Sequence, residues 1–209
     1  MVREMWPETY KLNVSREIAD KLKIYHALLL KWQKAINLIS PKSVDDAWVR
    51  HFLDSAQVER HVSRESLTVA DLGCGGGFPG LVLAIMRPDL KIHLVESDER
   101  KCQFLRTVSR ETNVNVMVHN SRIESCIDEV KPDFVMARAL ADLSALLGYV
   151  DVWSQGNCDL ECIFLKGAQL EKEIEEAQKI FTFEFDKFPS ITDPHAALIH
   201  IRNISRNLC

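Results

Sequence analysis

The chain has 209 residues, of which 46% are hydrophobic, so it can bury the core of a folded domain and is not expected to be disordered. Its formal net charge of −4 argues against a protein that binds nucleic acid through bulk positive charge. The first 65 residues carry 11 basic and 9 acidic side chains and the remainder 15 and 21, so any contact with a polyanion is expected mainly in the first third.

Residues 1–65 are predicted to form an N-terminal helical cap. Over residues 15–37 apolar side chains recur at steps of three and four, which is typical of a helix with one buried face, and Ser15 is a suitable N-cap. A second helix is predicted over residues 43–58, where a serine is followed by acidic residues. Lysines interrupt the apolar run at 27–30, so we expect no membrane span, no signal peptide and a cytoplasmic location.

The six cysteines form no C-x-x-C pair and have no histidine at the usual spacing of metal ligands. They are therefore predicted to be reduced, mostly buried thiols, and no metal site is expected. Cys74 lies near a predicted helix start, where a thiol can be acidified, but no base lies beside it in the sequence. We interpret it as a structural residue.

The pattern of the sequence changes near residue 66. Short apolar runs now alternate with helical stretches, which is typical of a mostly parallel sheet in a doubly wound α/β fold. The last two apolar runs are joined by a short loop without a helix, so they are predicted to form an antiparallel hairpin at the sheet edge. Residues 66–209 are thus predicted to form one Rossmann-like unit. Its seven expected strands lie at 68–72, 91–96, 114–119, 133–137, 160–165, 181–188 and 197–204, and its helices near 80–87, 98–111, 140–153 and 168–179.

A glycine-rich loop follows the first predicted strand, in the stretch VADLGCGGGFPG at residues 69–80. From Gly75 to Gly80 it fits the dinucleotide-binding pattern G-x-G-x-x-G, and Glu96 follows the first of these glycines by about twenty residues, as that pattern requires. The pattern alone does not decide between a dinucleotide and another ligand. Gly77 is expected either to adopt a positive φ or to allow close approach of the ligand.

Four residues favour S-adenosylmethionine as the ligand of this loop. Pro79 removes a backbone N–H that a pyrophosphate would use, and Phe78 crowds the approach. A carboxylate at Asp71, about 4 Å from a phosphate, would cost on the order of 4 kcal/mol, whereas it would stabilise an ammonium or sulfonium ion. Glu96 could accept hydrogen bonds from ribose hydroxyls. A tight turn without a ligand, and a nicotinamide or flavin site, remain the alternatives.

The segment after the fourth predicted strand, 134–139, bears on the methyl acceptor. It has no Pro-Pro-aromatic segment of the kind used on exocyclic amino groups, and no Pro-Cys nucleophile of the kind that attacks a pyrimidine carbon. A ring nitrogen with a free lone pair, such as nitrogen 7 of guanine, requires neither. Alignment and a desolvated site are then sufficient for catalysis.

Seven segments, in order over about residues 30–170, together form a specific pattern: Asn37-Leu38-Ile39-Ser40, Arg50 to Ser55, Asp71 to Gly80, Val95-Glu96-Ser97, Arg122-Ile123-Glu124, Ala137-Arg138-Ala139 and Leu165-Lys166-Gly167. With these segments the sequence resembles the bacterial small-subunit ribosomal RNA guanine-7 methyltransferases, the RsmG or GidB family. This resemblance implies a class I S-adenosylmethionine-dependent methyltransferase that modifies one guanine of 16S ribosomal RNA, with 16S RNA or the small ribosomal subunit as partner.

The resemblance also implies roles for individual residues. Ile123 and Glu124 are expected to flank the adenine, and Arg138 to reach the cofactor or the substrate. The remaining expected cofactor-binding residues are Asp71, Gly73, Gly75, Gly77, Phe78 and Glu96.

The substrate side is less determined by the sequence. Arg50 and His51 form either a substrate-binding pair or a solvated arginine beside a structural histidine. Lys166 holds RNA phosphate or is simply solvated, and Arg122 is a further candidate at the pocket mouth. A non-catalytic ribosome-assembly or RNA-binding module, and a dinucleotide-dependent oxidoreductase, are the alternative functions. We expect a monomer.

Overall fold

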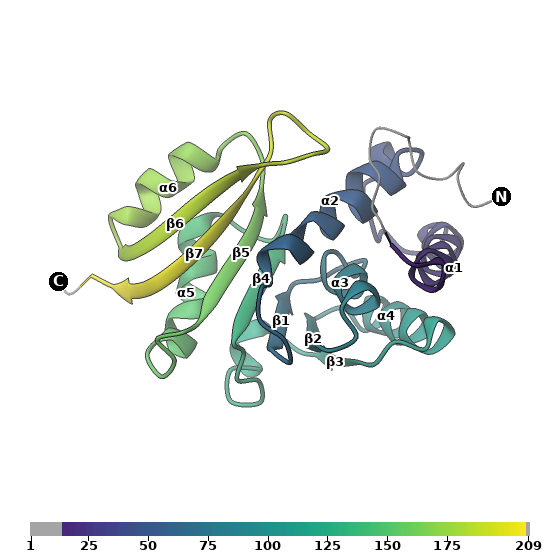
Figure 1. Ribbon diagram of the computed structural model, residues 1–209, viewed down its shortest axis with the longest axis horizontal. Coiled ribbons are helices and arrows are strands. Elements are labelled where there is room, and N and C mark those ends of the chain that lie inside the picture. The colour runs from purple at the N-terminus through teal and green to yellow at the C-terminus, as the bar shows by residue number, and fades with distance from the viewer. Residues whose placement is uncertain (1–13, 208–209) are drawn as a thin grey trace.

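The computed structural model describes residues 14–207, and a seven-stranded sheet lies at its centre (Figure 1). The strand order is β3-β2-β1-β4-β5-β7-β6; β1 to β5 pair in parallel, and β7 is antiparallel to both β5 and β6. The predicted mostly parallel sheet with a C-terminal hairpin is confirmed. The strands are β1 (Thr68–Leu72), β2 (Lys91–Glu96), β3 (Val116–Asn120), β4 (Phe134–Arg138), β5 (Glu161–Lys166), β6 (Phe181–Pro189) and β7 (Ala197–Arg206).

Helices cover both faces of this sheet. Figure 1 shows α1, α3 and α4 gathered at one end of the molecule, and α6 with the β6–β7 hairpin at the other. The α-helices are α1 (Arg16–Gln33), α2 (Asp54–Ala56), α3 (Gly80–Met86), α4 (Glu99–Thr112), α5 (Leu143–Ser154) and α6 (Leu170–Gln178), and the shorter turns are η1 (Pro41–Ser43), η2 (Trp48–Leu53), η3 (Gln57–His61) and η4 (Ile123–Ser125).

Two hydrophobic clusters lie on opposite faces of the sheet. Along β4, Phe134 and Met136 belong to the cluster that includes α1, α3 and α4, whereas Val135 and Ala137 belong to the cluster that includes α5 and α6. This alternation follows from the two-residue period of a strand, and because both faces are covered, most residues of the central strands are apolar.

The N-terminal helices share the first cluster with the sheet. Leu22, Tyr25 and Leu29 of α1 are fully buried, and they pack with residues of α3 and α4. The sheet begins shortly after the predicted boundary at residue 65. The division into a cap and a larger unit stays a prediction, because one continuous core crosses that boundary.

The second predicted helix differs from its expected form. Ser43 lies in the 3₁₀ turn η1 and does not cap a helix; its hydroxyl donates to the carbonyl of Ser40 and contacts His51 instead. The helical segment starts at Trp48 with the π-helical turn η2 and continues through α2 and η3. π-Helical turns occur frequently at functional sites, and this one carries Arg50 and His51.

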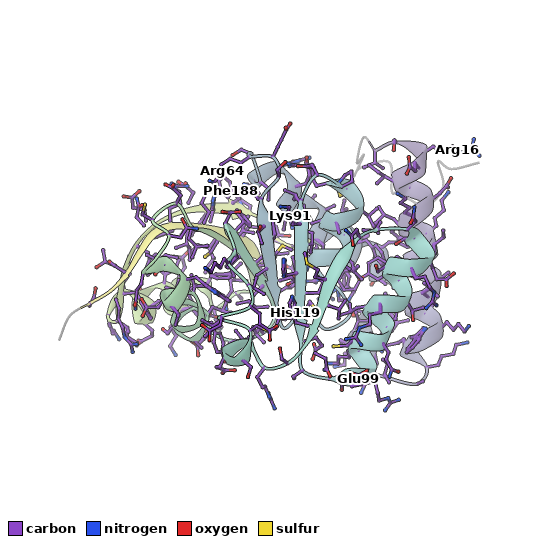
Figure 2. The ribbon with its side chains drawn as sticks, turned by 90° about the horizontal axis from the view of Figure 1, so that it is seen from below. Arg16, Arg64, Lys91, Glu99, His119 and Phe188 are labelled. Atoms are coloured by element: carbon purple, nitrogen blue, oxygen red, sulfur yellow. The ribbon has the colours of Figure 1, made fainter. Side chains whose placement is uncertain are left out.

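The carboxyl ends of the parallel strands meet at one edge of the sheet. Figure 2 shows Arg64 and Lys91 near the amino ends of the central strands, and His119 and Glu99 near the opposite edge. Ligands of open α/β sheets bind at the carboxyl edge. Within the described residues 14–207, none of the helices combines the length and the apolar character needed to span a membrane.

Candidate active site

The glycine loop after β1 depends on backbone conformations that other residues rarely adopt. Gly73, Gly75 and Gly77 have φ values of +61°, +53° and +92°. A Cβ at Gly77 would lie 2.5 Å from Cδ1 of Leu81, so protein fills the space there. At Gly75 the nearest atom to such a Cβ is the carbonyl oxygen of Gly73 at 3.9 Å, so the loop is open to a ligand at Gly75 rather than at Gly77.

Asp71 lies at the end of β1 and has no exposed surface. Its Oδ2 accepts a hydrogen bond of 2.7 Å from the backbone N–H of Gly80, which fixes the start of α3 against the strand. Burial raises the pKa of Asp71 to about 8; the N–H of Gly80 opposes this shift, and the nearby Glu96 adds to it. Its Oδ1 is buried without a hydrogen-bond partner. A buried carboxylate with one unpaired oxygen fits a cationic ligand.

Glu96 ends β2 and holds the loop from the neighbouring strand. Its Oε2 accepts from the N–H of Gly75 at 3.0 Å, and its Oε1 accepts from the N–H of Asp98 at 2.9 Å. Each carboxylate oxygen keeps further acceptor capacity, which a ligand hydroxyl can use. The turn η4 follows the carboxyl end of β3, so its residues Ile123, which is buried, and Glu124, which is exposed, lie near the same sheet edge.

Phe78 anchors the loop to the N-terminal helices. Its buried ring stacks on Tyr25 with a centroid distance of 5.3 Å and packs against Phe52 at 5.1 Å and His51 at 5.2 Å. The hydroxyl of Tyr25 donates to the carbonyl oxygen of Gly76 at 2.5 Å. Phe78 thus has a packing role that the sequence did not indicate, and its role in lining a cofactor pocket stays a prediction.

Arg138 ends β4 and is held by three groups of the segment 50–54. Its Nε lies 3.2 Å from Oδ2 of Asp54, one terminal nitrogen donates to Nδ1 of His51 at 2.9 Å, and the other donates to the carbonyl of Arg50. Burial lowers the pKa of Arg138, and the charge of Asp54 opposes that shift. Of the expected catalytic residues, the structure therefore brings Arg50, His51 and Arg138 together.

Asp54 connects these residues to the β6–β7 loop. Its Oδ1 accepts hydrogen bonds from Nε2 of Gln57 at 2.7 Å, Oγ of Ser190 at 3.0 Å and Oγ1 of Thr192 at 2.9 Å. Asp54 was not among the predicted site residues. Its signal was an acidic residue between the apolar Phe52–Leu53 and Ala56, where only a paired carboxylate is stable.

His51 is fixed as a neutral imidazole. Because a guanidinium can only donate, the contact with Arg138 makes Nδ1 the acceptor, so Nε2 carries the proton and donates to Oγ of Ser43 at 2.7 Å. Burial, together with the charges of Arg138 and Arg50, lowers the pKa of His51 to about 3. The imidazole is thus suited to orienting Arg138 and not to taking up a proton.

A cavity of about 720 Å³ lies at the carboxyl ends of β4 and β5. Arg50, Arg138 and Lys166 contribute to its walls, together with Ser190 and Thr192 of the β6–β7 loop. Leu140 also lines this cavity, and a Cβ on Gly73 would lie only 2.4 Å from Cδ1 of Leu140. The cavity and the glycine loop are therefore neighbours, separated by the segment that follows β4.

Lys166 and Arg50 differ in their freedom to contact a ligand. The ammonium of Lys166 is 2.5 Å from Oε2 of Glu173 and donates to the carbonyl of Ala141 at 2.7 Å, and the side chain is only 8% exposed. Arg50 is exposed at the cavity. Lys166, like Arg138, is thus paired inside the protein, whereas Arg50 is exposed.

Comparisons with known proteins point to one family. A family model described as rRNA small subunit methyltransferase G matches residues 18–202. The chain is 46% identical to ribosomal RNA small subunit methyltransferase G of Paramagnetospirillum magneticum, with 94% of each chain covered, and 42% identical to the protein of the same name from Ruegeria pomeroyi, with 97% and 99% covered.

Solved structures share the fold at low sequence identity. A mutant of MtNAS in complex with S-adenosylmethionine has a TM-score of 0.61 at 14% identity, over 88% of this chain and 75% of that one. The fibrillarin/Nop5p complex has a TM-score of 0.55 at 15% identity, over 71% and 79%. These likenesses support the class I methyltransferase fold expected from the sequence.

Proposed function

The chain belongs to the rRNA small subunit methyltransferase G family, as its sequence motifs predicted, and from this premise we propose that it transfers a methyl group from S-adenosylmethionine to nitrogen 7 of one guanine in 16S ribosomal RNA. The observation that carries the proposal is the buried oxygen of Asp71 without a partner, beside an open Gly75 and next to a cavity. The cationic cofactor would contact Asp71 and Gly75, and the acceptor base would occupy the cavity.

In this proposal the glycine loop holds the cofactor, which supplies an electrophilic methyl group on a sulfonium sulfur. Asp71 stabilises its positive charge through Oδ1, and Glu96 accepts hydrogen bonds from its ribose. Ile123 and Glu124 flank its adenine. Because Asp71 and Glu96 are already hydrogen-bonded to Gly80 and Gly75, their carboxylates are positioned before the cofactor binds, which reduces the cost of ordering them.

The cavity holds the acceptor base. Nitrogen 7 of guanine has a free lone pair, so transfer requires no base from the protein, and the residues of the chain act by aligning the base and excluding water. The methylated ring becomes cationic. Acidic side chains in the cavity wall, at Asp46, Asp142 and Asp193, favour that developing charge over the neutral base.

Arg138 shapes the wall between the two ligands. Its guanidinium is fixed by Asp54 and His51, so it presents a rigid cation at the carboxyl end of β4. A phosphate or carboxylate is the natural partner of such a group. Arg138 is therefore assigned to substrate RNA or to the carboxylate of the cofactor.

Two experiments test the proposal. Calorimetry with S-adenosylmethionine and with NAD separates a methyltransferase from a dinucleotide oxidoreductase, since only the former ligand is expected to bind. Methyl transfer to small-subunit particles that lack the modification separates an enzyme from a non-catalytic RNA-binding module. Strand scission of the product RNA by reduction and aniline identifies 7-methylguanine, and methylation without scission would assign a different acceptor atom.

A further inference from the structure

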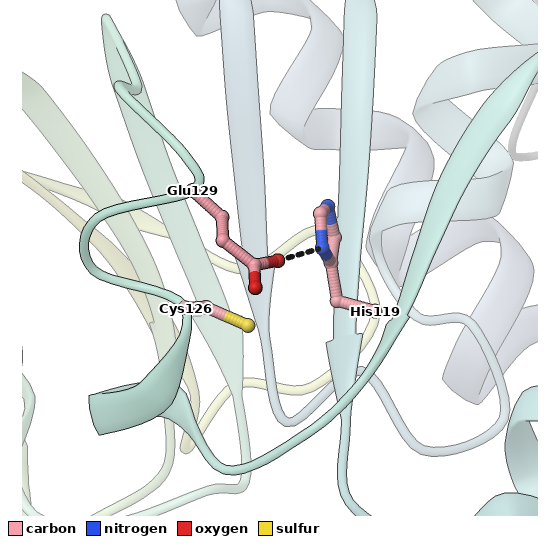
Figure 3. A group of neighbouring side chains, drawn as sticks. All are labelled: His119, Cys126 and Glu129. Atoms are coloured by element: carbon pink, nitrogen blue, oxygen red, sulfur yellow. Dashed lines mark ion pairs between the residues drawn. The ribbon is translucent and has the colours of Figure 1, made fainter.

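A histidine, a cysteine and a glutamate gather at the carboxyl end of β3, away from the cavity (Figure 3). One ligand atom from each of His119, Cys126 and Glu129 lies within 4.8 Å of the others. His119 is on β3, and the other two residues lie in the turn that follows η4. No metal site was expected from the sequence, because the cysteines form no C-x-x-C pair and no histidine stands at the usual spacing from them.

The separation of the His119 and Glu129 ligand atoms suits a tetrahedral ion. Nδ1 of His119 lies 3.4 Å from the nearest carboxylate oxygen of Glu129. Two ligand atoms bound about 2.1 Å from a tetrahedral ion are about 3.4 Å apart, and a sulfur ligand requires about 3.6 Å. Cys126 is buried, whereas the side chain of Glu129 is 66% exposed, so the carboxylate can adjust its position and solvent reaches the site from its side.

Two further residues support the ligand atoms. Nε2 of His119 lies 2.9 Å from Nδ1 of His93, and in the tautomer that donates along this contact the Nδ1 lone pair of His119 faces the carboxylate of Glu129. In that tautomer two electron-rich atoms face each other, an arrangement that a cation between them stabilises. Oγ of Ser121 lies 2.6 Å from Sγ of Cys126 and can donate to a thiolate. Hydrogen bonds of this kind commonly orient metal ligands.

We propose that His119, Cys126 and Glu129 bind one Zn²⁺ ion, with water in the fourth position. A neutral imidazole, a thiolate and a carboxylate are a ligand set that zinc accepts, and the two anionic groups neutralise the charge of the ion. The thiol proton of Cys126 passes to solvent on binding. The ion connects β3 to the turn after η4, and thus stabilises the segment that carries Ile123 and Glu124.

Titration of the reduced full-length chain with Co²⁺ as a spectroscopic probe tests the site. We expect one ion per chain, a thiolate-to-cobalt charge-transfer band, and loss of that band when Zn²⁺ displaces Co²⁺. Cys126→Ser removes the sulfur ligand with little change in volume and is expected to abolish the band. Glu129→Gln is expected to weaken binding by about tenfold or more.

Matched controls distinguish ligand loss from indirect effects. Cys158→Ser removes an exposed cysteine that is not part of the proposed site, and Asp128→Asn removes a charge next to Glu129. Both variants are expected to bind Co²⁺ with the affinity of the wild-type chain. Glu129 and Asp128 are exposed, so neither substitution disturbs the core. A wild-type chain without a charge-transfer band, a band that persists in Cys126→Ser, or equal weakening by Asp128→Asn and Glu129→Gln would each overturn the proposal.

Discussion

The glycine loop and the cavity beside it are built in different ways. In the loop, carboxylates bind backbone N–H groups that are near in sequence: Asp71 binds Gly80, and Glu96 binds Gly75. In the cavity wall, Asp54 binds side chains from β4 and from the β6–β7 loop, more than eighty residues further along the chain. A site built from local backbone contacts can be read from a short motif, whereas a side-chain network depends on the whole topology.

The sharpest test of this contrast is Asp54→Ala. The substitution leaves Arg138 buried without its carboxylate and removes an acceptor shared by Gln57, Ser190 and Thr192. We expect the free energy of unfolding to fall by about 3–5 kcal/mol, measured by urea denaturation. Asp46→Ala removes an exposed acid of the same cavity and serves as the control, with an expected change within about 0.5 kcal/mol.

Arg138→Met tests the same network by removing the basic partner of Asp54. Asp54 keeps three donors when Arg138 is lost, whereas Arg138 keeps no carboxylate when Asp54 is lost. Arg138→Met should therefore destabilise the protein less than Asp54→Ala. Equal losses would contradict this asymmetry, and a loss below about 1 kcal/mol for Asp54→Ala would show that the network contributes little to stability.

In the glycine loop, Gly77→Ala is expected to cause the next largest loss in the free energy of unfolding. The residue has a φ of +92°, and its new Cβ would lie 2.5 Å from Leu81 and 2.7 Å from the hydroxyl of Tyr25. Strain and overpacking together predict a loss of about 2–4 kcal/mol in the free energy of unfolding. At Gly75 the space is open, so Gly75→Ala should cost only about 1–2 kcal/mol, from strain alone. Thermal denaturation of both variants gives the comparison, and equal losses would contradict it.

The sequence predicts the fold and the glycine loop better than it predicts the network in the cavity wall. The alternation of apolar runs fixed the layers of the fold, because each strand needs both faces covered, and the positive φ values of the loop glycines follow from their residue type. The apolar neighbours of Asp54 indicate a paired carboxylate, but its partners could not be assigned, because Arg138, Ser190 and Thr192 meet it only through folding. The π-helical form of η2 has no signal in the sequence that we can identify.

Lys166 illustrates the limit for charged residues. The sequence predicts that Lys166 lies at the end of a strand, before Gly167, and it does not decide whether the side chain contacts RNA or is solvated. The structure gives it a third environment, because Glu173 of α6 and the carbonyl of Ala141 occupy its ammonium. A residue's position on a strand is predictable, but the partner brought to it by a later helix is not.

The negative charge of Asp71 is expected to contribute to binding of the cofactor. Asp71→Asn keeps an oxygen acceptor for the N–H of Gly80 but removes the charge. We expect affinity for S-adenosylmethionine to fall about tenfold to more than a hundredfold, equivalent to roughly 1.5–3 kcal/mol, by calorimetry. An affinity unchanged within about twofold would remove Asp71 from the cofactor site.

The raised pKa of Asp71 adds a dependence on pH. Only the ionised carboxylate holds the cation, so affinity of the original chain should rise with pH up to about 8, and binding at neutral pH should release a proton. The stability of the free protein depends on pH in the opposite direction. Because the folded pKa lies above the unfolded one of 3.8, this group's contribution is greatest at low pH and is lost as pH rises through about 8 in the free protein. Both trends should be absent in Asp71→Asn.

The smallest expected effect lies at the cavity mouth, where Arg50 and Lys166 differ in exposure. If Arg50 contacts an RNA phosphate, Arg50→Ala should weaken binding to small-subunit particles and reduce the salt dependence of that binding by about one unit of slope. Cofactor affinity should be unchanged, because the guanidinium of Arg50 is exposed and its backbone carbonyl still accepts from Arg138. Lys166→Ala should instead leave the slope unchanged and lower stability, since it removes the ammonium partner of the partly buried Glu173. Binding and methyl transfer measured across a salt series separate the two variants. Equal salt slopes for Arg50→Ala and the original chain would place the RNA on another face.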